Sequence, residues 1–147
     1  MIALVQRVSR SRVLVEGRPI AEIGRGINVL LGIRREDGVD AIEKLVPKLV
    51  HLRIFPDEEG RMNRTLSEVG GEALVVSQFT LAGSVRKGRR PSFDGAMPAG
   101  EAKVLYERFC EELARHVPVA TGRFGAMMEV EIHNDGPVTF IIDTREL

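Results

Sequence analysis

Three hydrogen-bonding side chains occur within four positions in the segment Ser77-Gln78-Phe79-Thr80-Leu81. The segment ends the most strongly apolar run of the chain, residues 73–81, which we predict to be a strand. Polar side chains at a buried strand end are informative because interiors are usually apolar. Two explanations stay open. The side chains satisfy the backbone where the strand becomes a loop, or they line the floor of a site whose unpaired N–H groups point at a substrate oxygen.

Ser77 or Thr80 could alternatively be a nucleophile, which needs a neighbouring base. No Gly-x-Ser-x-Gly turn surrounds Ser77. The histidines, His51, His116 and His133, are scattered along the sequence, and we expect a structural or surface role for each. A base could still reach the segment through the fold, so the sequence leaves the nucleophile open.

A second unusual segment, Gly136-Pro137, stands between two strand-like runs. Such a dipeptide is typical of a hairpin turn. A cis bond would instead hold two carbonyl groups rigidly on one side of the chain, and about 5–6% of X-Pro bonds are cis. The local sequence does not distinguish these two structures.

The elements that would position both segments follow from hydrophobic periodicity. Strands are predicted over residues 2–8, 13–15, 20–23, 27–33, 51–55, 73–81, 127–132 and 138–143, with a hairpin at Gly17-Arg18-Pro19. Residues 57–61 and 63–71 are predicted to be turn and loop. Helices are predicted over residues 39–50 and from Pro98 to about residue 117. Because Pro47 falls inside the first helix, we expect a kink or a later start there.

Composition limits the class of protein. The chain has 147 residues, 44% hydrophobic and 29% charged, which predicts one folded domain over residues 1–147. No run approaches the roughly 18 apolar residues of a membrane span, and no signal-peptide pattern is present, so we expect a cytoplasmic protein. Cys110 is the only cysteine, which excludes an internal disulfide. No phosphate-binding, dinucleotide-binding or metal-binding motif occurs, so we expect no cofactor and no metal.

The overall charge does not indicate a nucleic-acid binder, because 21 basic and 21 acidic residues give a net charge of zero. A local cluster could do so. Four positive charges, Arg86, Lys87, Arg89 and Arg90, surround Gly88. A solvated basic loop is nearly as good an explanation for them as a phosphate-binding one.

The chain resembles the D-aminoacyl-tRNA deacylase family, also called the D-tyrosyl-tRNA deacylase family. The resemblance rests on both unusual segments, the second extended to Gly136-Pro137-Val138-Thr139, and on three others. These are Gln6-Arg7-Val8, Arg90-Pro91-Ser92-Phe93 and Thr121-Gly122-Arg123-Phe124-Gly125-Ala126. All five occur in the family's order from Met1 to about Phe140. Ser77 and Phe79 match the D-specific form, whereas a paralogous deacylase has Pro and Ala there.

The resemblance implies a single α/β domain with mixed β-sheets in a layered, barrel-like α/β/β arrangement and two main helices. It implies hydrolysis of the ester between a D-amino acid and the terminal ribose of tRNA, without a cofactor. It also implies cleavage of glycyl-tRNA, including glycine mischarged on tRNA-Ala. The partners implied are aminoacyl-tRNA and a second copy of the chain, in a homodimer with the active site at the subunit interface.

The resemblance also assigns roles to the first segment. The backbone N–H groups of Phe79 and Thr80 would face the developing oxyanion, and Ser77 and Gln78 would shape the site. An aminoacyl ester is already activated, so positioning and oxyanion stabilisation would suffice, with water attacking and the ribose hydroxyl helping.

The remaining site residues are implied to bind the substrate. Gly136-Pro137 would be a cis selector that enters the partner's active site and leaves no room for an L side chain, and Arg7 would brace it. Phe124 and Met128 would pack against the terminal adenine. The phosphates of the acceptor end could meet the basic loop, Arg86, Lys87, Arg89 and Arg90.

Two other functions remain as alternatives. The basic loop alone is compatible with a nucleic-acid-binding module that has no catalytic activity. Ser77 and Thr80 are compatible with a serine or threonine hydrolase of small esters.

Overall fold

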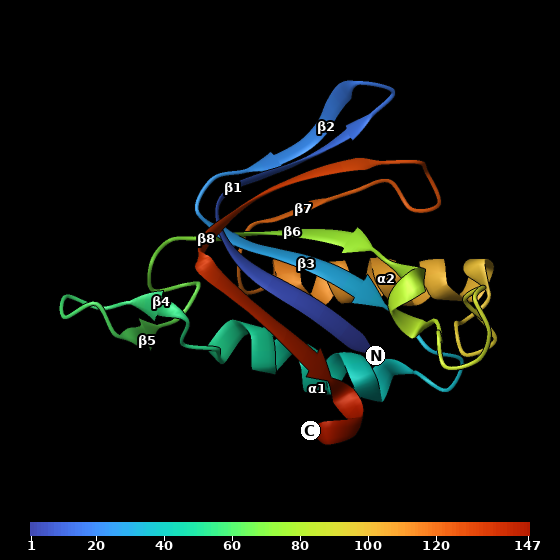
Figure 1. The fold of residues 1–147 in the computed structure, drawn as a ribbon. Helices are drawn as coiled ribbons and strands as arrows, with labels where there is room; N and C mark the ends of the chain where they lie inside the picture. The colour runs from blue at the N-terminus through green and yellow to red at the C-terminus, as the bar shows by residue number, and fades with distance from the viewer.

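The computed structural model describes residues 1–147 as one α/β domain, in which two helices cover one face of a mixed sheet (Figure 1). The helices are α1 (Val39–His51) and α2 (Ala99–Ala114). The strands are β1 (Ile2–Val15), β2 (Arg18–Ile23), β3 (Gly26–Gly32), β4 (Phe55–Pro56), β5 (Met62–Arg64), β6 (Glu72–Ser77), β7 (Val119–Thr121) and β8 (Glu129–Asp143). Short 3-10 helices, η1 (Phe79–Ala82) and η2 (Thr144–Glu146), follow β6 and β8. Neither α-helix has the length and apolar character needed to span a bilayer.

The main sheet is mixed because two kinds of connection build it. Its path is β2-β1-β3-β6-β7, and β8 pairs with β1 outside this path. β1 is antiparallel to β2, β3 and β8, whereas β3, β6 and β7 are parallel. Parallel neighbours require a crossover, which α1 supplies between β3 and β6 and α2 supplies between β6 and β7. β6 is therefore held on both edges by parallel strands.

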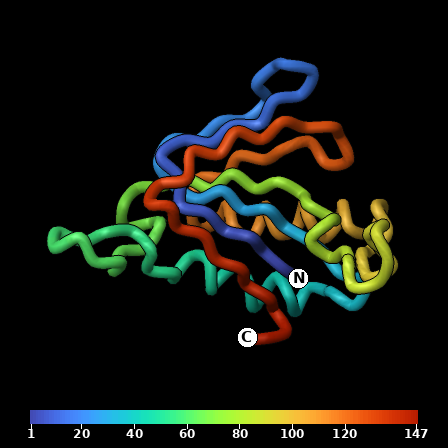
Figure 2. The backbone as a smooth tube through the Cα atoms, in the orientation of Figure 1, coloured from blue at the N-terminus to red at the C-terminus, as the bar shows by residue number.

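Two hydrophobic clusters fill the two faces of this sheet. The larger lies against the helices and includes Leu45 and Phe109. The smaller lies on the opposite face and includes Val13 and Val76. β1, β2 and β8 curl over that second face (Figures 1 and 2), so the sheet is nearly barrel-shaped. The expected single-domain α/β arrangement with two main helices is confirmed.

The first helix and the first hairpin are confirmed. α1 buries six residues at helical spacing, Ala41, Ile42, Leu45, Val46, Leu49 and Val50. It already begins at Val39, so the later start is not observed, and Pro47 is exposed on the solvent side. Residues 2–8 and 13–15 belong to one long strand, β1, which pairs with β2 across the predicted turn. The second helix ends at Ala114, before residue 117.

The strand predicted over residues 51–55 is wrong. His51 is the last residue of α1, and a strand begins only at Phe55, in the two-residue β4. β4 pairs with β5, which extends into the loop predicted over residues 63–71. Ile54 and Phe55 are buried, so the apolar run correctly indicated burial. It did not indicate which backbone partner, if any, the run would have.

Two further strand predictions are corrected at the segments that matter for function. β6 ends at Ser77, and residues 79–82 form η1 in place of the end of the predicted strand. The strands predicted over residues 127–132 and 138–143 are one strand, β8, whose two halves both run antiparallel to β1. Gly136-Pro137 is therefore a bulge within a strand and not a hairpin turn.

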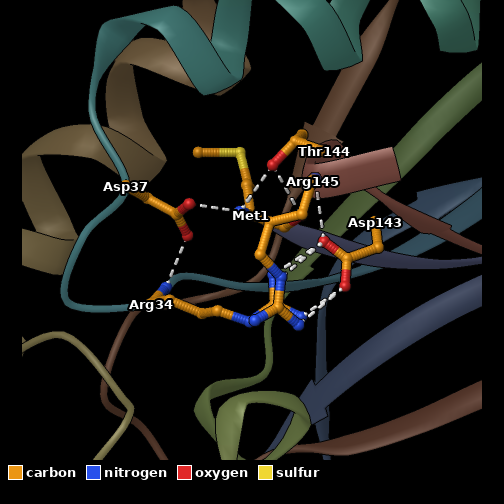
Figure 3. A network of polar contacts seen from close by, with 6 residues as sticks. All are labelled: Met1, Arg34, Asp37, Asp143, Thr144 and Arg145. Atoms are coloured by element: carbon orange, nitrogen blue, oxygen red, sulfur yellow. Dashed lines mark hydrogen bonds and ion pairs between the residues drawn. The ribbon is translucent and has the colours of Figure 1, made fainter. Parts of the chain in front are cut away.

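A polar network ties both ends of the chain to the loop before α1 (Figure 3). The Met1 amino group donates to Asp37 and, at 2.8 Å, to the Thr144 hydroxyl. The Arg34 guanidinium donates to both carboxylate oxygens of Asp143 at 2.9 and 2.7 Å, and Arg145 donates to the same carboxylate. Burial raises the pKa of Asp143, but hydrogen bonds from Arg145 and Arg34 outweigh this and hold it well below its usual 3.8.

Replacing Asp143 by Asn is expected to cost about 3 kcal/mol at neutral pH, because it leaves a mostly buried Arg34 guanidinium without its counter-charge. Since the folded-state pKa is lowered, this stability is present above about pH 4 and declines as the pH falls through the folded-state value. Urea unfolding of Asp143→Asn and of the parent should therefore differ least in acid. Glu59→Gln, which breaks an exposed ion pair with Arg61, is the control. A difference that stays constant from pH 7 to strong acid would contradict this account.

Candidate functional site

The C-terminal end of β6 is fixed by contacts from three directions. The buried Tyr106 hydroxyl of α2 donates to the Val75 carbonyl at 2.7 Å. The Gly122 N–H donates to the same carbonyl at 3.1 Å, and the Gln78 N–H donates to the Leu31 carbonyl at 2.8 Å. These hydrogen bonds determine where the chain leaves the sheet, immediately after Ser77.

The turn that follows leaves two backbone donors free of local partners. The first hydrogen bond of η1 is donated by the Leu81 N–H to the Gln78 carbonyl at 3.2 Å. The N–H groups of Phe79 and Thr80 lie ahead of it, so no carbonyl within the turn can accept from them. Both residues are exposed, and the Gln78 side-chain amide donates to the Thr80 hydroxyl. This is the geometry that a site floor made of backbone donors requires.

A cavity of about 690 Å³ opens beside this turn and is lined mostly by apolar side chains. Ser77, Gln78 and Phe79 contribute from the end of β6, and Phe124 and Met128 contribute from the segment between β7 and β8. The fold therefore brings five of the predicted site residues to one cavity from two distant segments. Thr80 does not line it.

The cavity lining has one charged side chain, Arg35, which the sequence analysis missed. Arg35 lies between β3 and α1, and its guanidinium donates to the Asp94 carbonyl. No His, Asp, Glu or Cys belongs to the lining, so Ser77 has no side-chain base beside it there. No motif surrounds Arg35 in the sequence, and only the fold reveals its position.

Three aromatic rings, those of Phe79, Phe93 and Phe124, belong to the cavity wall. Phe93, also missed as a site residue, contacts Phe79 edge to face with ring centroids 5.0 Å apart. The Phe124 ring lies 5.7 Å from that of Tyr106. A Cβ at Gly122 would approach the Met128 sulfur to 2.9 Å, so glycine lets that thioether pack closely. Such a surface suits a flat ring system.

The thiol of Cys110, which is buried on α2 beside Tyr106, is not a reactive group. Burial raises the pKa of Cys110 to about 12, so the thiol is neutral at physiological pH. Burial likewise raises the pKa of Tyr106, whose hydroxyl is committed to Val75.

The Gly136-Pro137 segment forms a bulge with a cis peptide bond. Gln6 pairs with Thr139 and Val8 pairs with Asn134, so four residues of β8 stand opposite the single residue Arg7. Gly136 has a φ of +133°, which side-chain-bearing residues rarely adopt, and a Cβ there would meet Val138 at 2.7 Å. Both the conformation and the space at this position require glycine.

Two side chains hold the bulge in place. Arg7 donates from Nε to the Asp135 carbonyl at 3.1 Å and from Nη1 to the Ile54 carbonyl at 2.7 Å. Asn134, which the sequence analysis missed, accepts from the Val138 N–H at 2.8 Å and donates to the Thr139 hydroxyl at 2.9 Å. Arg7 was expected to brace the Gly-Pro carbonyl, whereas in the structure its Nε donates to the carbonyl of Asp135, the residue before Gly136.

The bulge and the cavity of the same chain lie apart. Neither Gly136 nor Pro137 lines the cavity. Arg7 pairs with Ile27 near the start of β3, whereas Ser77 pairs with Leu31 near its end. Four residues of extended strand correspond to about 13 Å. A single protomer thus does not bring the two unusual segments together.

The predicted basic loop projects beside the cavity. The Ser84 and Ser92 backbones exchange two hydrogen bonds of 2.8 Å, which close the loop at its base next to Phe93. Its cationic side chains are exposed, form no ion pair and do not line the cavity: Arg86, Lys87, Arg89 and Arg90. The chain gathers no group of three or more His, Cys, Asp or Glu side chains that could hold a metal ion.

Comparison with known proteins decides the family. The family model described as D-Tyr-tRNA(Tyr) deacylase matches residues 4–143. The chain belongs to the D-aminoacyl-tRNA deacylase family. The D-aminoacyl-tRNA deacylases of a Nitratiruptor species and of Persephonella marina are each 57% identical to it, over all of both chains.

Solved structures share the fold of this chain. A structure titled c-Myc DNA Unwinding Element Binding Protein superposes with a TM-score of 0.93 at 45% identity, covering 97% of this chain and 98% of that one. A probable eukaryotic D-amino acid tRNA deacylase gives 0.78 at 22% identity, covering 96% and 97%, and shares the fold. The expected family resemblance and the expected fold are both confirmed.

Proposed function

We propose that this chain hydrolyses the ester between a D-amino acid and the terminal ribose of tRNA in the cytoplasm, and so removes D-amino acids from translation. Membership of the family supports a hydrolase that acts on the ester bond of aminoacyl-tRNA. One observation carries the mechanism. The apolar cavity has no side-chain base, and its lining includes Phe79, whose N–H, like that of the next residue Thr80, has no hydrogen-bond partner within the turn.

In the proposed mechanism, water attacks the ester carbonyl carbon while the N–H groups of Phe79 and Thr80 stabilise the oxyanion. The bond to the ribose oxygen then breaks, and the neighbouring ribose hydroxyl relays the proton from water to that oxygen. One well-placed oxyanion donor is worth about 10²–10³ in kcat. Because the ester is already activated, such donors and correct positioning suffice. Ser77 and Gln78 shape the cavity and hold the turn.

The proposed chiral selector is Gly136-Pro137 of a second copy, in a homodimer whose active sites lie at the subunit interface. The separation of bulge and cavity within one chain supports this assignment, as does the bracing by Arg7 and Asn134. Carbonyl groups of the bulge would bind the substrate amino group and leave no room for an L side chain. Glycine has no side chain to reject, so glycyl-tRNA, including glycine mischarged on tRNA-Ala, would also be cleaved.

The terminal adenosine would occupy the aromatic part of the cavity, with its base against Phe124 and Met128. Phosphates of the acceptor end would meet the basic loop around Gly88, which projects beside the cavity. Arg35, the only cation in the lining, would attract a phosphate or a ribose oxygen at the entrance.

A nucleic-acid-binding module without catalytic activity is the second candidate. One relative of known structure is titled as a DNA unwinding element binding protein, and the basic loop is unpaired. This candidate predicts nucleic-acid binding with no ester cleavage. A hydrolase with a Ser77 or Thr80 nucleophile has less support, because the cavity supplies no base.

Purified protein mixed with D-tyrosyl-tRNA and, separately, L-tyrosyl-tRNA should cleave the D ester at least about a hundredfold faster, since the L side chain is excluded by shape. Glycyl-tRNA should be cleaved as well. Release of free amino acid is followed against buffer alone, because aminoacyl esters hydrolyse spontaneously. Equal rates on the D and L esters would contradict the selector. Tight tRNA binding without any cleavage would favour the second candidate.

Ser77→Ala and Thr80→Ala should each keep kcat within about tenfold of the parent, because the oxyanion donors are backbone groups. Phe79→Pro removes one such donor, at a turn position that tolerates proline, and should lower kcat by about 10²–10³. Single-turnover kinetics with radiolabelled amino acid measure both the rate and any covalent intermediate. Near-complete loss in Ser77→Ala or Thr80→Ala, or a trapped acyl-enzyme, would establish the nucleophile instead.

A further inference from the structure

A groove of about 490 Å³ on the solvent side of α1 has no part in the site described above. Lys44, Pro47, Lys48 and His51 line it from one face of the helix, where positions three and four residues apart are neighbours. Arg53, just beyond the helix, extends the same row. Two lysines, an arginine and an imidazole are thus concentrated along one side of a short helix.

The cations of this groove form no direct ion pair within the protein. Lys44, Lys48 and Arg53 are exposed, and none forms an ion pair. No acidic side chain lines the groove. Asp40 and Glu43 also lie on α1 but pair with neither lysine. Because the whole chain has a net charge of zero, attraction of a polyanion depends on such local clusters.

One end of the groove, at Arg53, lies near the bulge that carries Gly136-Pro137. Arg53 precedes Ile54, whose carbonyl accepts from Arg7 at 2.7 Å, and Arg7 holds the Asp135 carbonyl. A second hollow adjoins the groove and shares Lys48, Leu52 and Leu147 with it. Ile141 of β8 lines this hollow, and so do the acidic residues Asp143 and Glu146. Ile141 is four strand residues from Pro137, about 13 Å along β8. Of the groove cations, Arg53 is therefore the one nearest the bulge, with Lys48 and Lys44 successively further along α1, and no residue of the groove lines the chain's own cavity.

We propose that this groove binds backbone phosphates of the tRNA whose aminoacylated end occupies the cavity of a second copy of the chain. The inference rests on the proposed function, in which the bulge enters that cavity. Each active site would then be flanked by two cationic surfaces, the loop around Gly88 from one copy and the α1 groove from the other. The lysines supply point charges that suit a phosphate without reading sequence.

Replacing both lysines, Lys44→Gln with Lys48→Gln, tests the proposal, because glutamine keeps the helix propensity and removes the charge. The matched control, Arg18→Gln with Arg108→Gln, removes two exposed cations elsewhere. Fluorescence anisotropy measures the Kd of each protein for uncharged tRNA between about 50 and 200 mM salt. Loss of two phosphate contacts should lower the slope of log Kd against log salt by about two in the groove variant. The ratio of its Kd to that of the parent should therefore be about tenfold smaller at 200 mM salt than at 50 mM. The control should keep the parent slope.

Kinetics with two substrates separate this inference from the proposed function. On D-tyrosyl-tRNA the groove variant should show a raised KM with unchanged kcat. On D-tyrosyl-adenosine, which is too short to reach α1, it should match the parent. If the salt dependence of tRNA binding is the same in the groove variant and the parent, as expected if the groove binds an acidic peptide, the inference is overturned. An equal loss of kcat/KM on D-tyrosyl-tRNA and on D-tyrosyl-adenosine also overturns it. A parent that binds tRNA but cleaves neither ester contradicts the proposed function, while the binding comparison still decides the role of the groove.

Discussion

The contact on which the proposed function depends most is the one between Arg7 and the bulge of β8. Four residues opposite one would leave part of the β1–β8 ladder without cross-strand partners. The Arg7 guanidinium joins the Asp135 carbonyl to the Ile54 carbonyl, and its side chain is only 11% exposed. Rejection of a side chain by shape requires groups that do not yield when a larger group approaches. Arg7 and Asn134 supply that rigidity to a glycine whose φ and surroundings accept no other residue.

The same reliance on backbone groups characterises the cavity. Parallel pairing of β6 with β3 and β7 sets the strand end, and the turn into η1 leaves the Phe79 and Thr80 amides ahead of the first hydrogen bond. Fixed dipoles of this kind act without reorganising during the reaction, which suits an activated ester that needs little help from acid–base groups. Most of the charge is separated from this chemistry. Apart from Arg35, the cations invoked in the proposals lie outside the cavity, on the loop around Gly88 and along α1. The proposed function therefore assigns recognition of a polyanion and selection of a mirror image to different surfaces.

Much of this structure could be predicted from the sequence where periodicity and burial coincide. The period of α1 and the hairpin at Gly17 are examples, and the strand ending at Ser77 was correctly identified as buried. Prediction failed where the structure of a segment depends on which other strand its backbone pairs with. Residues 79–82 look like a continuing strand, but β3 has no further residue to pair with them in parallel register. Gly136-Pro137 looks like a hairpin turn in the sequence. Only the pairing with the long strand β1 shows that the chain keeps the same direction on both sides of it. Arg35, Phe93 and Asn134 have ordinary local sequence, so their positions at the cavity and the bulge follow from the tertiary fold alone.

The central claim, that the bulge of one copy completes the cavity of another, is tested most directly by mixing two disabled chains. Gly136→Ala disturbs the bulge and keeps the cavity, whereas Phe79→Pro disables the cavity and keeps the bulge. Each protein alone should be nearly inactive on D-tyrosyl-tRNA. Refolded together in equal amounts, half of the dimers should be mixed and carry one intact composite site, so about a quarter of the parent activity should return. A mixture that stays as inactive as its components would contradict the claim.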